Sequence, residues 1–410
     1  MTNASEAVGS TSGERMSPLL IVVLLALLLG VQPIATDLYL PALPGLAADL
    51  NAGVGRAQAT LSALIFAFGL SQLLLGPAAD RFGRRPVLLG GLLLLVIASA
   101  GAALAADIAE LVAWRALQGI GVGAAVVCAR AMVRDLYVPT DGARVMSKAL
   151  SGLGLIALAS PLLGGLIATL LGWRATLAVS GVFGLGCLLL VALAMPETAR
   201  TLNPAALRLA PMFVVWWRIL RHPTFLSWSL LVSCTYGGLF AFLAASAFVF
   251  IDVLGMSRMA CGLYIAGMSI SYIIGTFWCR RWLLRHGLAG AVRRGAAFTL
   301  AGGASMAALA WAGVVSPWAI ALPQFAFAFG HGIHQPCGQA AVVGPFPQQA
   351  GAASALAGFM LAATAVAVGA WLGVAMDGTV RPLTDTVGAM AAATALVAWT
   401  LVQRHGESVR

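Results

Sequence analysis

Residues 19–44 read LLIVVLLALLLGVQPIATDLYLPALP, an unbroken apolar run followed by a segment that carries one carboxylate, Asp37. Apolar runs of about 20 residues, the length that crosses a hydrocarbon core of ~30 Å, recur along the whole chain. Of the 410 residues, 60% are hydrophobic and only 9% are charged, whereas about a quarter of the residues of a soluble domain are charged. The sequence therefore predicts an all-α polytopic membrane protein.

Twelve membrane spans are expected where apolar windows are broken by charge, proline or glycine. Their expected ranges are 17–43, 57–77, 86–106, 108–132, 147–170, 174–194, 224–250, 258–279, 295–315, 317–341, 350–374 and 383–402. A longer polar stretch divides them six and six, which is the layout of a transporter made of two six-helix halves.

The expected domains follow from this division. They are a disordered cytoplasmic tail at 1–16, an N-terminal six-helix bundle at 17–195, a cytoplasmic linker at 196–223, a C-terminal six-helix bundle at 224–402 and a cytoplasmic tail at 403–410. The linker is basic and partly amphipathic, and its Trp216 and Trp217 suit the membrane interface. The six cysteines form no CxxC pair, so we interpret them as small apolar packing residues.

The net charge of +10 is interpreted as a topology signal rather than as a surface for nucleic acid or acidic lipid. With the N-terminus inside, the cytoplasmic segments hold 18 of the 24 Lys and Arg residues. The periplasmic segments hold four, namely Arg56, Arg174, Arg258 and Arg381. Because Lys and Arg concentrate on the cytoplasmic side of membrane proteins, both termini are expected to be cytoplasmic.

The segment after the second span reads GPAADRFGRRPVLLGG at 76–91. Gly76 would permit a tight contact, and Asp80 precedes Arg84 by four residues, so it can pair with Arg84 or cap a neighbouring helix. This motif resembles the signature between the second and third helices of the major facilitator superfamily. The resemblance implies the major facilitator fold, two pseudo-symmetric six-helix bundles, and a conformational latch at Gly76, Asp80, Gly83 and Arg84. The loop after the eighth span, GTFWCRRWLLRHG at 275–287, is a weak internal repeat with Cys279 in place of Asp80.

Two further motifs support the same family. LVAWRALQGIGVGAA at 111–125 resembles its fourth-helix motif through Arg115, Gln118 and Gly119, although Arg115 alone would also fit an arginine that extends to the periplasmic interface. ASPLLGG at 159–165 resembles the fifth-helix motif regarded as a mark of antiporters. Its members here are Pro161, Gly164 and Gly165, with Ser160 replacing the usual glycine. The alternative for this stretch is an ordinary Gly/Pro kink.

Four further stretches indicate a particular branch of this superfamily. They are TDLYLPALP at 36–44, VRDLY at 133–137, SAFVFIDVLGMS at 246–257 and GPFPQQAGAASALAG at 344–358. They resemble the twelve-span drug:proton antiporters, and within these the branch that exports bicyclomycin, chloramphenicol and florfenicol. The resemblance implies a monomer in the bacterial inner membrane that exchanges protons for an amphiphilic drug and needs no cofactor beyond the proton gradient.

Asp37 is the candidate proton carrier, with Arg115 as the second charged group of the coupling site. Keeping an aspartate protonated at neutral pH in water costs about 4 kcal/mol, and inserting its ionised form at a bilayer centre costs on the order of 3 kcal/mol. Because these two free-energy costs oppose each other and are similar in size, Asp37 is expected to take up or release its proton whenever its surroundings change. The alternative places Asp37 at the outer interface, because it lies ~27 Å along a helix from Leu19.

The expected wall of the substrate cavity combines aromatic and polar side chains. Its candidates are Tyr39, Gln118, Tyr236, Phe240, His331 and His334. Ordinary helix packing is the alternative for each of them. His331 and His334 lie three residues apart on one helical face, but no third ligand is evident, so no metal site is expected.

Other classes of function are less favoured. A membrane enzyme would need a catalytic or phosphate-binding motif, and no HExxH, GxSxG or GxxxxGK[ST] motif is present. A proton-linked importer or a facilitator of a small metabolite is the serious rival, and Pro161 to Gly165 argue against it. A non-transporting receptor or scaffold is the remaining alternative.

Overall fold

The computed structural model describes residues 16–137, 139–199 and 201–406, and every regular element in these ranges is helical. The tail predicted at 1–16 lies outside the described residues except for Met16, whereas the tail predicted at 403–410 begins inside a helix, Leu401–His405, and only 407–410 lie outside the described residues. Helices are what an apolar chain of this kind requires, because a helix satisfies all its backbone polar groups internally where no water can do so.

The N-terminal half contains six long helices. They are α1 (Pro18–Thr36), α3 (Val54–Phe82), α4 (Arg84–Leu104), α5 (Ile108–Leu136), α6 (Pro139–Leu170) and α7 (Trp173–Ala194). Two short elements, η1 (Leu40–Ala42) and α2 (Leu43–Asp49), continue from α1. The shorter helix α8 (Leu209–Leu220) lies between the two halves of the sequence.

The C-terminal half is built in the same way. Its elements are α9 (Pro223–Ala247), the π-helical η2 (Phe248–Val253), α10 (Arg258–Trp311), α11 (Pro317–Val343), η3 (Pro347–Gln349), α12 (Ala350–Ala375), α13 (Arg381–Trp399) and α14 (Leu401–His405). The long α10 is two helices that meet at Gly287, where φ is 67° and the backbone is not helical. Glycine suits this position because it has no Cβ to oppose a positive φ.

Ten described helices are long and apolar enough to cross a membrane. One of them is α10, which supplies two crossings because it turns at Gly287. The 27-residue α11 adds another, although polar residues such as Gln324, His331 and His334 lower its apolar character. The described chain thus provides the twelve predicted spans.

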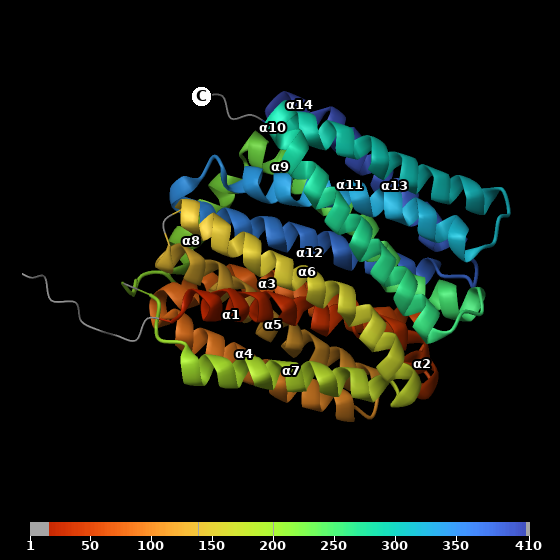
Figure 1. Ribbon diagram of the computed structural model, residues 1–410, viewed down its shortest axis with the longest axis horizontal. Helices are drawn as coiled ribbons and strands as arrows, with labels where there is room; N and C mark the ends of the chain where they lie inside the picture. The colour runs from red at the N-terminus through yellow and green to blue at the C-terminus, as the bar shows by residue number, and fades with distance from the viewer. Residues whose placement is uncertain (1–15, 138, 200, 407–410) are drawn as a thin grey trace, which may run out of the picture.

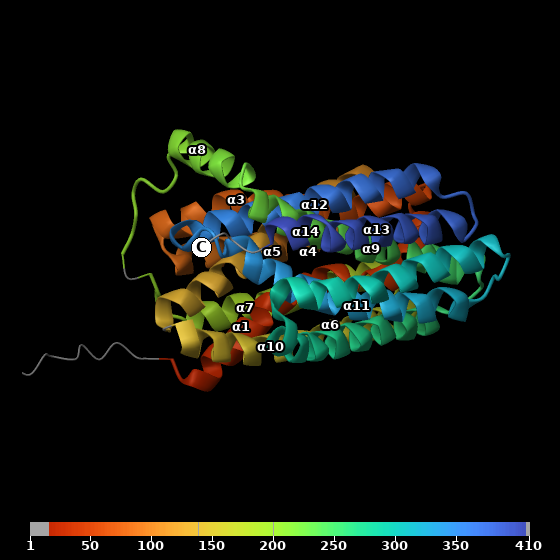
Figure 2. The same cartoon turned by 90° about the horizontal axis from the view of Figure 1, so that it is seen from above.

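The helices form two bundles that lie side by side (Figure 1). The N-terminal bundle fills the lower half of that view and the C-terminal bundle the upper half, with α6 and α12 at the seam between them. Across the seam, α3 packs against α12, and α6 packs against α10. Helix α8 lies at one end of the molecule, together with the start of α1 (Figure 2). At the opposite end, η1 and α2 contact α9, η2 and α10.

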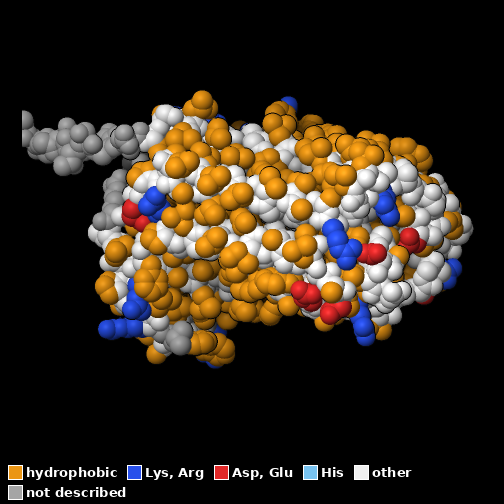
Figure 3. Space-filling model, turned by 90° about the horizontal axis from the view of Figure 1, so that it is seen from below, with side chains coloured by type: hydrophobic (Ala, Val, Ile, Leu, Met, Phe, Trp, Pro, Cys, Tyr) orange, Lys and Arg blue, Asp and Glu red, His pale blue; other side chains and the backbone are white. Residues whose placement is uncertain are grey.

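The outer surface is apolar where a bilayer would surround it. Figure 3 shows hydrophobic side chains spread across one face, with charged side chains gathered toward its two ends. Large exposed side chains such as Leu93 and Ile97 of α4 and Val182 and Leu189 of α7 contribute to this surface. A lipid environment makes their exposure favourable.

Two predicted loops differ clearly from the structure, and one of them, at 275–287, is helical up to the turn at Gly287 within α10. The segment at 76–91, expected to be a loop, consists of the last turns of α3, a turn at Gly83 and the first turns of α4. Helix α3 continues past the apolar window because charged side chains do not by themselves end a helix, and it ends at the turn of Gly83. The polar sequence therefore does not mark the helix boundary.

Candidate functional site at the bundle seam

Asp37 follows directly after the last residue of α1. Pro33 lies within α1, and the Asp37 amide closes the helix by donating to the Pro33 carbonyl at 2.7 Å. The Asp37 carboxylate accepts a hydrogen bond from the Thr36 hydroxyl at 2.8 Å. The side chain is half-buried, and η1, which begins three residues later, contacts α9 and α10 of the other bundle. Asp37 therefore lies close to the seam between the bundles.

Arg115 of α5 is fully buried beside the end of α1. Its guanidinium donates to Gln118 Oε1 at 2.7 Å and to the Ala35 carbonyl at 2.9 Å. It also lies 4.4 Å from the centre of the Tyr39 ring. The last carbonyls of a helix lack partners within it, so a buried guanidinium can satisfy one of them. This position excludes the alternative in which Arg115 extends to the interface.

Arg115 and Asp37, which the sequence places in one coupling site, lie at the same end of α1 without pairing directly. No ion pair of Asp37 occurs among the described residues, and Arg115 instead contacts the backbone two residues before it. Tyr39 and Gln118 are buried, and so are three other candidates for the cavity wall, Phe240, His331 and His334. The Tyr39 hydroxyl lies 2.8 Å from Thr60 Oγ1, and Gln118 donates to Ser99 Oγ at 2.7 Å. These residues build a polar network that fixes the end of α1.

Aromatic rings from the C-terminal bundle gather around Tyr236. Its ring centre is 6.4 Å from that of Phe240 and 6.5 Å from that of His331. The His331 ring also lies 5.6 Å from the Tyr272 ring, and its Nδ1 is 3.1 Å from Thr235 Oγ1. Tyr272 was missed by the sequence analysis, because one tyrosine in an apolar span carries no distinguishing pattern. The result is an aromatic cluster in the bundle opposite Asp37.

His334 does not join this cluster. Its Nε2 lies 3.1 Å from Thr299 Oγ1 in the second part of α10, and its Nδ1 has no partner among the described residues. His331 and His334 share one helical face, as expected, but they contact different helices. Among the described residues, no group of three or more His, Cys, Asp or Glu side chains is placed to hold a metal ion.

Helix α6 approaches other helices closely at its Pro-Gly motif. A Cβ at Gly164 would collide with the Leu38 carbonyl, and one at Gly165 would meet the Arg258 carbonyl of α10 at 2.7 Å. From the other side, Gly262 of α10 lies against the Pro161 carbonyl. The Ser160 hydroxyl, in place of the usual glycine, donates to the Ile156 carbonyl at 2.7 Å. The motif thus brings α6 into backbone contact with both bundles beside Asp37.

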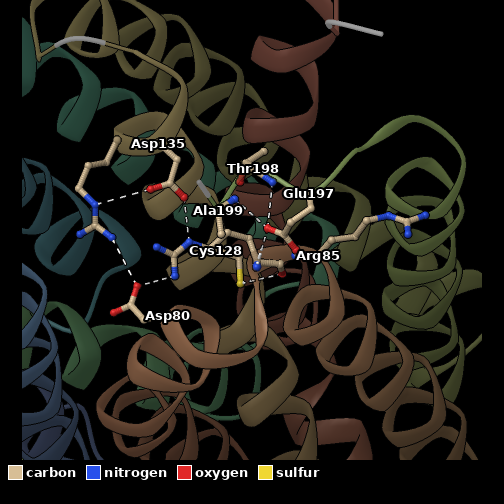
Figure 4. Close-up of polar contacts among 9 residues, drawn as sticks. Asp80, Arg85, Cys128, Asp135, Glu197, Thr198 and Ala199 are labelled. Atoms are coloured by element: carbon tan, nitrogen blue, oxygen red, sulfur yellow. Dashed lines mark hydrogen bonds and ion pairs between the residues drawn. The ribbon is translucent and has the colours of Figure 1, made fainter. Parts of the chain in front are cut away.

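A charged cluster forms at the α8 end of the N-terminal bundle (Figure 4). Arg84 is nearly buried and forms ion pairs with Asp80 and with Asp135 of α5, the latter at 2.9 Å. Arg134 lies 3.8 Å from Asp80 and 4.0 Å from Asp135. The four-residue spacing predicts the pairing of Asp80 with Arg84, but no local spacing predicts the second carboxylate, that of Asp135 in the VRDLY stretch.

Glu197 holds the beginning of α4. Its carboxylate accepts hydrogen bonds from the Arg84 and Arg85 amides at 2.9 and 3.1 Å, and from the Thr198 and Ala199 amides (Figure 4). Partial desolvation acts to raise the pKa of Glu197, but the four backbone donors outweigh it and lower this pKa from its ordinary value. Glu197 was also missed, although an acid just after an apolar span was a usable signal. It ties the start of the linker to the charged cluster.

The two glycines of the latch motif have different roles. Gly83 has φ 100°, and a Cβ there would press on the Glu197 carboxylate. The tight contact expected at Gly76 is absent, since the nearest atom to a Cβ there would be Val127 Cγ1 at 4.0 Å. Gly76 instead lines a cavity of about 550 Å³ at the α8 end. The backbone turn requires glycine at Gly83 only.

Twelve helices in two bundles, with an apolar exterior and a charge placed at the seam, define a multi-pass membrane transporter. The chain belongs to the Major Facilitator Superfamily, whose sequence model matches residues 25–403. The predicted family and fold are confirmed.

Relatives fall in the predicted drug-resistance branch. The chain is 31% identical to multidrug resistance protein D of Escherichia coli over 338 residues, which cover 82% of this chain and 84% of that protein. It is 26% identical to a bicyclomycin resistance protein homolog of Haemophilus influenzae over 398 residues, or 96% and 99% of the two chains. The xylose transporter XylE of E. coli, in a partially occluded inward-open conformation, superposes with a TM-score of 0.72 at 17% identity over 93% of this chain and 97% of that one.

Gly83→Ala is expected to destabilise the protein, because alanine disfavours φ 100° and its methyl group displaces Glu197. We expect a loss of ~1–3 kcal/mol, seen as a lower apparent unfolding temperature of the purified protein. Gly76→Ala is the matched control and should leave that temperature unchanged. Equal losses in the two variants would contradict the assigned roles.

Glu197→Ala removes an acceptor shared by four backbone amides and is expected to cost ~1 kcal/mol, the usual scale of a lost helix cap. Glu197→Gln keeps an amide oxygen at the same place and should recover most of the stability. Unfolding temperatures of the two variants make the comparison. If Glu197→Gln lowers the unfolding temperature as much as Glu197→Ala, the stabilisation comes from the negative charge of Glu197 and not from its hydrogen bonds to the backbone amides.

Proposed function

We propose that the protein is a proton-coupled efflux antiporter for amphiphilic drugs, located in the bacterial inner membrane with its α8 end in the cytoplasm. The observation that carries the proposal is the position of Asp37, which is half-buried near the seam, has no ion-pair partner among the described residues, and lies at the end of α1 that meets the bundle containing the aromatic cluster. The names of the relatives, a multidrug resistance protein and a bicyclomycin resistance homolog, support drugs as cargo.

The orientation rests on where the positive charges lie. Arg84, Arg85 and Arg134 belong to the α8 end, together with the linker arginines such as Arg208. Membrane proteins concentrate such residues on the cytoplasmic side. The opposite end, where η1 and α2 contact the C-terminal bundle, then faces the periplasm.

The proposed proton step uses one carboxylate. When the seam opens to the periplasm, water reaches Asp37, the carboxylate takes up a proton and its charge is lost. When the seam opens to the cytoplasm, the proton leaves, and the charge is restored beside the aromatic cluster. Burying an ionised carboxylate without water or a cation beside it raises the free energy by several kcal/mol. The ionised state of Asp37 therefore favours a bound ligand or an open, hydrated seam. Each cycle then moves a proton inward and a drug outward.

Arg115 is assigned a positioning role in this scheme. Its guanidinium donates a hydrogen bond to the Ala35 carbonyl and lies over the Tyr39 ring. These contacts fix the end of α1, next to Asp37. The two hydrogen bonds of Arg115 go to Gln118 and to a carbonyl and not to the Asp37 carboxylate, which leaves Asp37 free to change its protonation. The aromatic rings of Tyr236 and Phe240 provide apolar faces with one hydroxyl, a composition that suits neutral or zwitterionic amphiphiles.

Asp37→Asn tests the proton step directly. In proteoliposomes with an imposed pH gradient, the variant is expected to lose drug-dependent proton flux and gradient-driven drug uptake, while drug exchange without a gradient continues. Asp377→Asn is the matched control, because Asp377 lies in an exposed loop and bonds only to its own turn. Wild-type coupling in Asp37→Asn would remove Asp37 from the mechanism.

Cells provide the test of the direction of transport. Expression of the wild-type chain is expected to raise the inhibitory concentration of a phenicol or of bicyclomycin at least fourfold and to lower drug accumulation, and an uncoupler should abolish both effects. Cells that express Asp37→Asn at the same level should remain sensitive. Increased accumulation of the tested compounds would identify an importer and overturn the proposal.

A further inference from the structure

Two adjoining cavities lie at the α8 end, away from Asp37. The first, of about 550 Å³, is bounded by α3, α5, α8 and the start of α12. The second, of about 480 Å³, lies between α3, α8 and α12, and it shares Leu73 and Trp216 with the first. Together they lead from the seam to the lipid-facing side of α3 and α12.

The first cavity has an excess of positive charge. Four arginines line it, Arg84, Arg130, Arg134 and Arg208, with Asp80 as the acid among its lining residues. Asp80 and Asp135 already hold Arg84, and Arg134 reaches the same two carboxylates at longer distance. Neither Arg130 nor Arg208 has an ion-pair partner among the described residues. Two guanidinium groups in this cavity are therefore available to an anion.

The second cavity is apolar throughout its lining. It is built from leucine, phenylalanine, tryptophan and methionine side chains. Several of them are open to the surroundings: Leu74 is 47% exposed, Trp217 58% and Phe213 60%. Helix α8 carries both tryptophans, Trp216 and Trp217, which favour the level of the lipid headgroups. This groove opens where acyl chains of a bilayer would surround the protein.

We propose that these cavities form a binding site for an anionic phospholipid, with its phosphate between Arg130 and Arg208 and an acyl chain in the groove between α3, α8 and α12. The positive cavity alone would accept any small anion. The adjoining apolar groove, open on the bilayer side, favours a ligand with a long tail, and the leaflet at this end supplies one. The cytoplasmic leaflet is rich in anionic lipids.

Such a lipid would connect three parts of the molecule. Arg130 belongs to α5 of the N-terminal bundle, Arg208 lies just before α8, and the groove includes Phe359 and Met360 of α12 in the C-terminal bundle. The bound lipid stabilises the contact of α8 with both bundles. It therefore acts on the α8 end independently of the proton carrier at the opposite end of the seam.

Lipid-dependent stability of the full-length purified chain tests the proposal. Dioleoyl phosphatidylglycerol added to the delipidated protein is expected to raise the apparent unfolding temperature and to remain as one adduct in native mass spectrometry. Arg130→Gln and Arg208→Gln should each lose at least half of the temperature shift and most of the adduct. Arg144→Gln is the matched control at the same end, because Arg144 is exposed and pairs with Asp141 outside these cavities. Leu74→Trp, which fills the groove, should also weaken the adduct.

Three outcomes would overturn the proposal. Phosphatidylcholine that stabilises as well as phosphatidylglycerol would show general solvation by lipid. Inorganic phosphate that produces the same shift would show an anion site without a lipid. Unchanged lipid binding in both arginine variants that elute as monodisperse, folded protein would remove the cavity from the interaction.

Discussion

A charge inside an apolar bundle must be satisfied by the protein itself, because the surrounding lipid offers no polar groups. For Arg115 the chain provides an amide oxygen, a carbonyl and an aromatic ring, and not the nearby carboxylate of Asp37, while the Arg115 Nε has no hydrogen-bond partner among the described residues. This arrangement of Arg115 determines the surroundings of Asp37. The fixed positive charge holds the end of α1, and the carboxylate next to it retains a single hydroxyl donor and access to the seam.

The close approach of α6 supports the same arrangement. Gly164 lies against the carbonyl of Leu38, the residue that follows Asp37. Gly165 lies against α10 of the opposite bundle. Because backbone meets backbone there, a small displacement of one bundle changes the surroundings of Asp37 without rearranging side chains. In the proposed mechanism, this close approach at two glycines would couple Asp37 to the movement of the two halves.

The α8 end follows a different principle. There the charges lie near water, and Arg84 joins α3, α4 and α5 through two carboxylates while Glu197 anchors the start of the linker. The arginine-lined cavity beside this cluster contains the charges left over from these pairs. The two ends of the molecule thus differ: one carries Asp37, the proposed proton carrier, and the other carries arginines and carboxylates that pair with one another.

The sequence by itself determined the membrane class, the twelve spans, the family and the position of Asp37 at the end of the first helix, because apolar length and local motifs are properties of contiguous residues. It also indicated the pairing of Asp80 with Arg84, since four residues make one helical turn. It did not give the carbonyl that Arg115 holds, the second carboxylate of Asp135, the cap made by Glu197 or the cluster around Tyr236 and His331. Helices that are apolar all round show no periodicity that reveals which face meets which neighbour. Only the tertiary structure decided these contacts, because each joins residues far apart in the chain across helix interfaces that the sequence leaves unmarked.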